Sequence, residues 1–70
     1  MLYLIITNLN NKRECKQVCC SWTDATNLVQ LYQGQLASVI EVKANTTVKL
    51  TRVSTEILKA LNSHGIKVAV

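Results

Sequence analysis

Three cysteines lie close together near the start of the 70-residue chain, and they are the side chains best suited to chemistry. Their spacing is Cys15-x3-Cys19-Cys20, and the single histidine, His64, lies far along the chain. A zinc site needs four Cys or His ligands, usually in close pairs. Neighbouring residues of a strand point to opposite faces, so Cys19 and Cys20 would not share a metal. The spacing therefore favours small buried thiols, and we expect neither a metal nor a cofactor.

A thiol or metal protein acting through Cys15, Cys19 and Cys20 stays open as one hypothesis. A redox dithiol normally has the pattern Cys-x-x-Cys at the N-terminus of a helix, and that pattern is missing. Cys20 does precede a predicted helix, and Lys16 is near it in sequence. A single reactive thiol at Cys20 is the form that this hypothesis takes.

Catalysis has little support in the sequence. His64 is the only histidine, the residue type that most often serves as a base at neutral pH. The four acidic residues are scattered, and Asp24 and Glu56 each fall in the first turn of a predicted helix, where helix electrostatics explains them. No phosphate-binding loop or nucleophile motif is present. We expect a protein that is not an enzyme.

The chain carries an excess of basic charge, with a formal net charge of +4. A basic excess favours nucleic acid or an acidic protein surface as partner. Nucleic-acid readers usually add aromatic stacking platforms or a basic recognition helix, and the predicted helices hold only Lys59. Nucleic-acid binding is therefore the second choice. Its candidate contacts are the basic residues of two predicted hairpins, Lys12, Arg13, Lys16, Lys43, Lys49 and Arg52.

No segment of the sequence predicts a membrane anchor. The apolar opening, residues 1–6, is too short for the core of a signal peptide and follows no basic residue. No apolar run approaches the ~20 residues that cross a bilayer. An odd number of cysteines, three, fits a reducing compartment. We expect a cytoplasmic protein with no membrane partner.

The first part of the chain predicts a β-hairpin. Residues 2–9 are apolar on both faces, as in a central strand, and Asn10-Asn11 suits a tight turn. Residues 12–20 fit a helix that stacks Cys15 on Cys19, but Cys, Val and Trp favour a strand. Strand alternation then puts Cys15 and Cys19 on one face, with Cys20 and Trp22 turned to the core.

Residues typical of helix ends predict two helices. The first covers residues 23–33, with Ser21 or Thr23 as the N-cap and Gly34 as the stop. The second begins after Ser54 and ends at Gly65 in a Schellman stop. Its buried stripe includes Leu58 and Leu61.

Residues 36–53 read as a second hairpin. A loop over residues 44–46 pairs Ile40 with Leu50 and Glu41 with Lys49, which keeps the apolar partners on one face. Residues 66–70 form a closing strand.

These elements predict a single compact α+β domain over residues 1–70, with the order ββαββαβ. We expect a mostly antiparallel sheet with two helices packed on one face. A domain this small cannot bury all of its apolar side chains, so we expect a homo-oligomer, with a dimer favoured. The residues without a place in the core are Leu2, Leu31, Leu36, Val39 and Val70.

The function that the sequence favours is that of a small non-catalytic binding protein. The leading hypothesis is a protein–protein interaction module that acts through an edge strand or a helix face. A regulator, an inhibitor or an accessory protein of a phage or mobile element fits that size. Nucleic-acid binding through the hairpin lysines is the alternative, and a thiol or metal protein is the second alternative.

Overall fold

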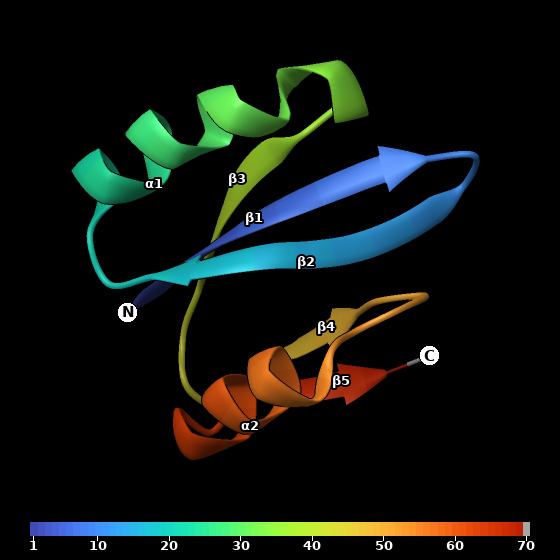
Figure 1. The fold of residues 1–70 in the computed structure, drawn as a ribbon. Helices are drawn as coiled ribbons and strands as arrows, with labels where there is room; N and C mark the ends of the chain where they lie inside the picture. The colour runs from blue at the N-terminus through green and yellow to red at the C-terminus, as the bar shows by residue number, and fades with distance from the viewer. Residues whose placement is uncertain (70) are drawn as a thin grey trace.

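The computed structural model describes residues 1–69 and shows a small α+β domain with the predicted order ββαββαβ (Figure 1). The elements are β1 (Leu2–Leu9), β2 (Lys12–Cys19), α1 (Trp22–Leu28), the 3-10 helix η1 (Val29–Gln35), β3 (Ser38–Val42), β4 (Thr47–Lys49), α2 (Thr55–Ser63) and β5 (Lys67–Ala69). Within these residues, no helix has both the length and the apolar character needed to span a membrane.

The first predicted hairpin is confirmed, and residues 12–19 form a strand rather than a helix. Leu9 pairs with Lys12 across the turn. Asn10 and Asn11 have φ values of 54° and 62°, which are the positive values that both central residues of a type I′ turn require. Asparagine tolerates this conformation better than other non-glycine residues, so the turn sets the register of the hairpin.

The second predicted hairpin is wrong, because its two halves pair with different strands. β3 lies antiparallel to β1, with Ile40 opposite Leu4, and forms a three-stranded sheet of order β2-β1-β3. β4 instead lies parallel to β5, with Val48 opposite Val68. Alternating apolar residues indicate which side chains are buried, but the same pattern fits either partner strand. The predicted pairing of Ile40 with Leu50 therefore does not exist.

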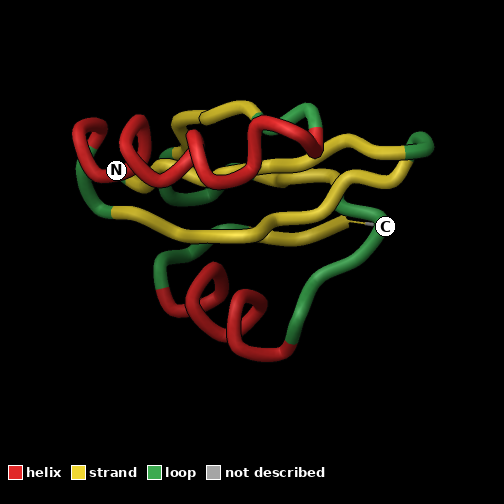
Figure 2. The backbone as a smooth tube through the Cα atoms, turned by 45° about the horizontal axis from the view of Figure 1, so that its top comes forward, coloured by secondary structure: helices red, strands yellow, loops and turns green. Residues whose placement is uncertain are grey.

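The helices do not share one face of the sheet as predicted, but cover opposite faces of the three-stranded sheet (Figures 1 and 2). Leu4 of β1 belongs to one buried cluster with Leu61 of α2. The next residue, Ile5, belongs to a second cluster with Ala25 of α1. Neighbouring strand residues point to opposite faces, so a strand that is apolar on both faces needs a cover on each.

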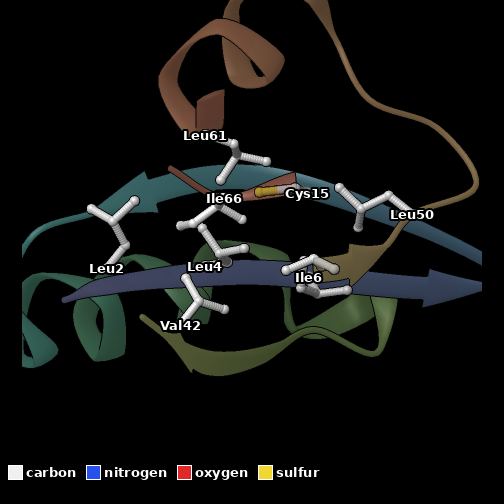
Figure 3. Close-up of a cluster of buried hydrophobic side chains, with 9 residues drawn as sticks. Leu2, Leu4, Ile6, Cys15, Val42, Leu50, Leu61 and Ile66 are labelled. Atoms are coloured by element: carbon white, nitrogen blue, oxygen red, sulfur yellow. The ribbon is translucent and has the colours of Figure 1, made fainter. Parts of the chain in front are cut away.

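The cluster on the α2 side, here called the α2 core, is drawn in Figure 3, and it has more buried members than the cluster on the α1 side. Its buried members are Leu2, Leu4, Ile6, Cys15, Val42, Val48, Leu50, Leu61 and Ile66. Leu61 is fully buried as predicted, while Leu58 is only half-buried. The α2 core joins the three-stranded sheet, the parallel pair and α2 into one unit.

The end signals of α2 are confirmed. The hydroxyl of Ser54 accepts a hydrogen bond from the Ile57 N–H at 3.3 Å. Gly65 has a φ of 76°, and the Ile66 N–H donates to the Leu61 carbonyl at 2.9 Å. This is the bond pattern of a Schellman stop, which needs a residue with positive φ after the helix.

The first helix is shorter than predicted, because its α-helical part ends at Leu28 and continues as η1. Ser21 rather than Thr23 is the N-cap, and its hydroxyl accepts from the Asp24 N–H at 3.1 Å. The left-handed residue that ends η1 is Leu36, with a φ of 54°, and not Gly34. The cluster under this segment, here called the α1 core, has Ile5, Cys19 and Ala25 as its buried members.

Candidate interaction surface

A β-bulge in β2 separates the cysteines that the sequence placed on one face. Ile5 pairs with Gln17 but Ile6 pairs with Cys15, so Lys16 is an extra residue in β2. An extra residue reverses the alternation of side chains beyond it. Cys15 therefore belongs to the α2 core and Cys19 to the α1 core, on opposite sides of the sheet.

Both buried cysteines are held as neutral thiols. Burial raises the pKa of Cys15 to about 11, and its thiol donates a hydrogen bond to the Gln17 carbonyl at 3.4 Å. Burial, reinforced by the charges of Asp24 and Cys20, also raises the pKa of Cys19. Within residues 1–69, no three Cys, His, Asp or Glu side chains converge as metal ligands would. The two buried thiols are thus too far from the thiolate form to act as ready nucleophiles at neutral pH.

Cys20 and Trp22 are exposed, although the sequence predicted both to face the core. The helix begins at Trp22 and buries Ala25 against the sheet, which leaves the indole 56% exposed. Trp22 packs edge-to-face against Tyr3, with ring centroids 5.7 Å apart. Because Tyr3 pairs with Glu41, this aromatic pair lies next to the C-terminal part of β3. Partly exposed Trp and Tyr side chains are frequent anchors of protein interfaces.

Part of the predicted basic surface comes together at one corner of the molecule. The Arg13 carbonyl accepts hydrogen bonds from Thr51 N–H at 2.9 Å and Arg52 N–H at 3.2 Å. Lys12 precedes Arg13 in the chain, and all three basic residues are exposed. We call Lys12, Arg13 and Arg52 the basic cluster.

The other predicted basic contacts do not extend the basic cluster into a stripe. Lys16 forms an ion pair with Glu14 at 3.0 Å. Lys43 precedes β4 and Arg52 follows it, so these two lie beyond opposite ends of that strand. Lys49, the last residue of β4, lies between them, and it is exposed. These contacts were predicted on two hairpins, and the second hairpin does not exist.

The outer edge of β2 is covered where the basic cluster lies. Besides the two bonds to its carbonyl, Arg13 donates its N–H to the Thr51 hydroxyl at 3.2 Å. The bulge at Lys16 interrupts the same edge further along. Bulges, charged side chains and covering segments are the features that prevent strand edges from pairing with other chains.

The hydrogen bonds of Arg13 also reveal which backbone groups of the sheet point outward. In an antiparallel ladder, a residue directs its N–H and C=O to the same side. Those of Arg13 point away from β1 to Thr51 and Arg52. The groups of Asn8, the partner of Arg13 in β1, therefore point away from β2, which is the side on which β3 lies.

Following this alternation along β1 identifies the free groups of β3. Leu4, four residues before Asn8, also directs its groups to β3 and exchanges them with Ile40. The neighbours of Ile40, which are Val39 and Glu41, must then direct their N–H and C=O away from β1. Within residues 1–69, no backbone hydrogen bond between elements reaches the outer side of β3. We call this row of groups the β3 edge.

The β3 edge lacks the bulge, the basic side chains and the bonded cover of the β2 edge, and its one charged residue is Glu41. Its five residues, Ser38–Val42, include no lysine, arginine or proline and no bulge. Sequence reasoning missed this edge because it assigned β3 a partner in β4. The signal that points to it is the absence of any basic residue or proline from residues 17–42.

Exposed leucines lie on the segment that leads into β3. Leu31 is 75% exposed and Leu36 is 69% exposed, as expected for residues without a place in the core. Val39 is half-buried, whereas Leu2 is buried in the α2 core, against expectation. Val70, the fifth residue of that prediction, lies outside the described residues. Leu9, opposite the first residue of β2, and Trp22, shortly after its end, are exposed as well, so unburied apolar side chains lie beside both edge strands.

Comparison of the chain with protein-family models, with curated proteins and with solved structures finds no match.

Proposed function

We propose that this protein is a small non-catalytic protein–protein interaction module that binds an extended polypeptide segment along the β3 edge. In this mode the bound segment adds a strand to the sheet, and backbone hydrogen bonds to Val39 and Glu41 supply much of the affinity. A regulator, an inhibitor or an accessory protein would act in this way by occupying a strand of its target.

The observation that carries the proposal is the contrast between the two edges of one sheet. The β2 edge has a bulge, basic side chains and a bonded cover at Arg13. The β3 edge has none of these. An unprotected edge invites pairing with another chain, so soluble proteins normally protect it unless it is used.

The surroundings of the β3 edge suit a protein partner. Leu36 precedes the strand, and Tyr3 with Trp22 lies beside its other end. Exposed apolar and aromatic side chains beside a strand give the side chains of an added segment something to pack against. The one charged residue of the strand is Glu41, which favours segments that carry a basic residue nearby.

A selection of peptides tests the proposal. The protein is immobilised sparsely, so that copies do not meet, and random peptides are selected on it. We expect the enriched peptides to have high strand propensity and to lose binding to the Glu41→Pro variant. Proline removes the outward N–H, and an edge strand tolerates it at such a position.

The matched control is Glu41→Thr, which removes the same carboxylate but keeps the N–H. Peptides that bind the parent and Glu41→Thr equally but fail on Glu41→Pro support strand addition. Peptides that bind all three proteins equally, with the fold of Glu41→Pro verified by circular dichroism, would contradict it.

Nucleic-acid binding is the second candidate function, and the basic cluster favours it. Lys12, Arg13 and Arg52 meet at one corner, and Lys49 precedes Arg52 by three residues, so a phosphate backbone would find several cations there. We expect such binding to fall steeply with salt. The double variant Arg13→Gln/Arg52→Gln should bind random duplex and single-stranded oligonucleotides more weakly than the parent does. The variant Lys43→Gln should bind them with the affinity of the parent. Equal affinities for the two variants would remove this candidate.

A reducing compartment such as the cytoplasm is the proposed location. Its support is that Cys15, Cys19 and Cys20 are all free thiols. Secreted domains of this size are commonly stabilised by disulfides instead.

A further inference from the structure

We infer that the β3 edge binds a second copy of this chain, with the two β3 strands antiparallel and Ile40 opposite Ile40 of the second copy. This inference rests on the proposed function, because it names the occupant of the same edge. The two three-stranded sheets then form one continuous sheet across a two-fold axis.

The outward groups of β3 select this register. Val39 and Glu41 are the strand residues whose N–H and C=O point away from β1. With the two-fold axis at Ile40, Val39 lies opposite Glu41 of the second copy, and Glu41 lies opposite Val39. Each of these pairs exchanges two backbone hydrogen bonds, as the bonded pairs of an antiparallel ladder do. Every outward group of the two residues is then satisfied.

The neighbouring symmetric registers are poorer. An axis at Glu41 places the two Glu41 carboxylates directly opposite each other, and like charges in that position are destabilising. An axis at Val39 leaves the pair of the two Val39 residues as the only bonded pair inside the strand, because Glu41 then lies opposite Ala37, which precedes β3. The axis at Ile40 avoids both problems and uses the whole strand.

The side chains fit the same arrangement. Ile40 is half-buried against the α2 core, so pairing brings two partly exposed isoleucines together on that face. On the other face, each Glu41 lies beside an uncharged Val39. The basic cluster lies at the opposite edge of the sheet, because the strand order is β2-β1-β3. The positive corners of the two copies therefore stay apart, which limits their mutual repulsion.

Disulfide trapping tests the register directly. In a Cys20→Ser background, which removes the exposed native thiol, Ile40→Cys places two introduced thiols opposite each other in a non-bonded pair of the ladder. Such a pair has the short separation that a disulfide needs. Glutathione disulfide serves as the oxidant, and each cross-link releases two molecules of glutathione.

The matched control is Glu41→Cys in the same background, one residue further along the same edge. We expect Ile40→Cys to cross-link at least about tenfold faster than Glu41→Cys, whose introduced thiol faces Val39 of the second copy. Faster cross-linking of Glu41→Cys, or equally slow cross-linking of both, would overturn the inferred register.

The mass of the parent protein in solution tests the occupant. Light scattering at high micromolar concentration should give about twice the 7.8 kDa of one chain, and Glu41→Pro should return the mass to one chain. A parent of one-chain mass throughout would overturn the second copy as occupant. Peptides that bind the parent but not Glu41→Pro would in that case still support the proposed function, so the two failures are distinguishable.

Discussion

β2 and β3 are the two edge strands of the same three-stranded sheet. They differ in whether their outward N–H and C=O groups are hydrogen-bonded to another segment of the chain. At β2, Arg13 bonds to Thr51 and Arg52, and a bulge at Lys16 interrupts the strand. At β3, Val39 and Glu41 direct their groups outward and no element covers them within residues 1–69. The comparison shows that the fold covers one edge of the sheet and leaves the backbone groups of the other unbonded.

The largest expected loss of stability comes from a substitution in the α2 core, which positions the segment that bonds to the outer edge of β2. Leu50 and Leu61 lie together in the α2 core, and Thr51 follows Leu50 directly. Leu61→Ala should lower the free energy of unfolding by about 2–5 kcal/mol, because Leu61 is fully buried. Urea unfolding followed by circular dichroism measures this. The control is Lys59→Ala on the exposed side of α2, and equal midpoints for the two variants would contradict the account.

The second prediction concerns how stability depends on pH through the thiol of Cys15, the residue directly before the bulge. Its pKa rises from 9.0 when unfolded to about 11 in the folded protein. The stabilisation from this shift is fully present below pH 9 and is lost as the pH rises through 11, in all about 2–3 kcal/mol. Unfolding free energies of the parent should therefore fall more steeply than those of Cys15→Ala over this window. Parallel pH profiles would show that burial in the α2 core does not hold this thiol out of water.

A smaller loss of stability is expected when one hydrogen bond between β2 and its covering segment is removed. Thr51→Val removes the acceptor of the Arg13 N–H. Water reaches this exposed group, so the loss should be only about 0.5–1 kcal/mol. The comparison variant is Thr47→Val, an exposed threonine of β4. Amide exchange of Arg13 should accelerate in Thr51→Val alone, and an unchanged rate there would mean that the hydroxyl does not protect the edge.

The smallest change in stability, and the sharpest test of the contrast, is the deletion of Lys16. Without this residue, Cys15 and Gln17 would continue one regular ladder opposite Ile6 and Ile5. We expect a folded protein whose unfolding free energy changes by no more than about 1 kcal/mol, and whose β2 edge now self-associates. Lys16→Ala keeps the bulge and removes the ion pair with Glu14, so it should not associate further. Light scattering that finds equal masses for both variants would contradict the role of the bulge.

The parts of the fold that local signals determine could be predicted from the sequence. Asn10-Asn11 gives the first hairpin, and Ser54 with Gly65 gives the ends of α2, because turns and caps depend on a few adjacent residues. Apolar residues on both faces of residues 2–9 also indicated a central strand correctly.

The pairing of distant strands could not be predicted in the same way. β3 and β4 have alternating patterns that fit each other as well as they fit β1 and β5, so the nearest partner was chosen wrongly. The bulge at Lys16 has no clear mark in the sequence, and it moved Cys15 and Cys19 to opposite faces. The β3 edge was missed for the same reason, since an edge is defined by the absence of a partner.

The central claim is that the β3 edge is free in the single chain and paired in the complex. Residue-resolved amide hydrogen exchange, measured by NMR in dilute and in concentrated protein, tests it most directly. The amide of Ile40, bonded to β1, should be protected in both samples. Those of Val39 and Glu41 should exchange freely when dilute and slow about tenfold once about nine in ten copies are paired, because only unpaired copies exchange. Slowing at the amides of β2 instead, or protection of Val39 and Glu41 in the dilute protein, would contradict the account.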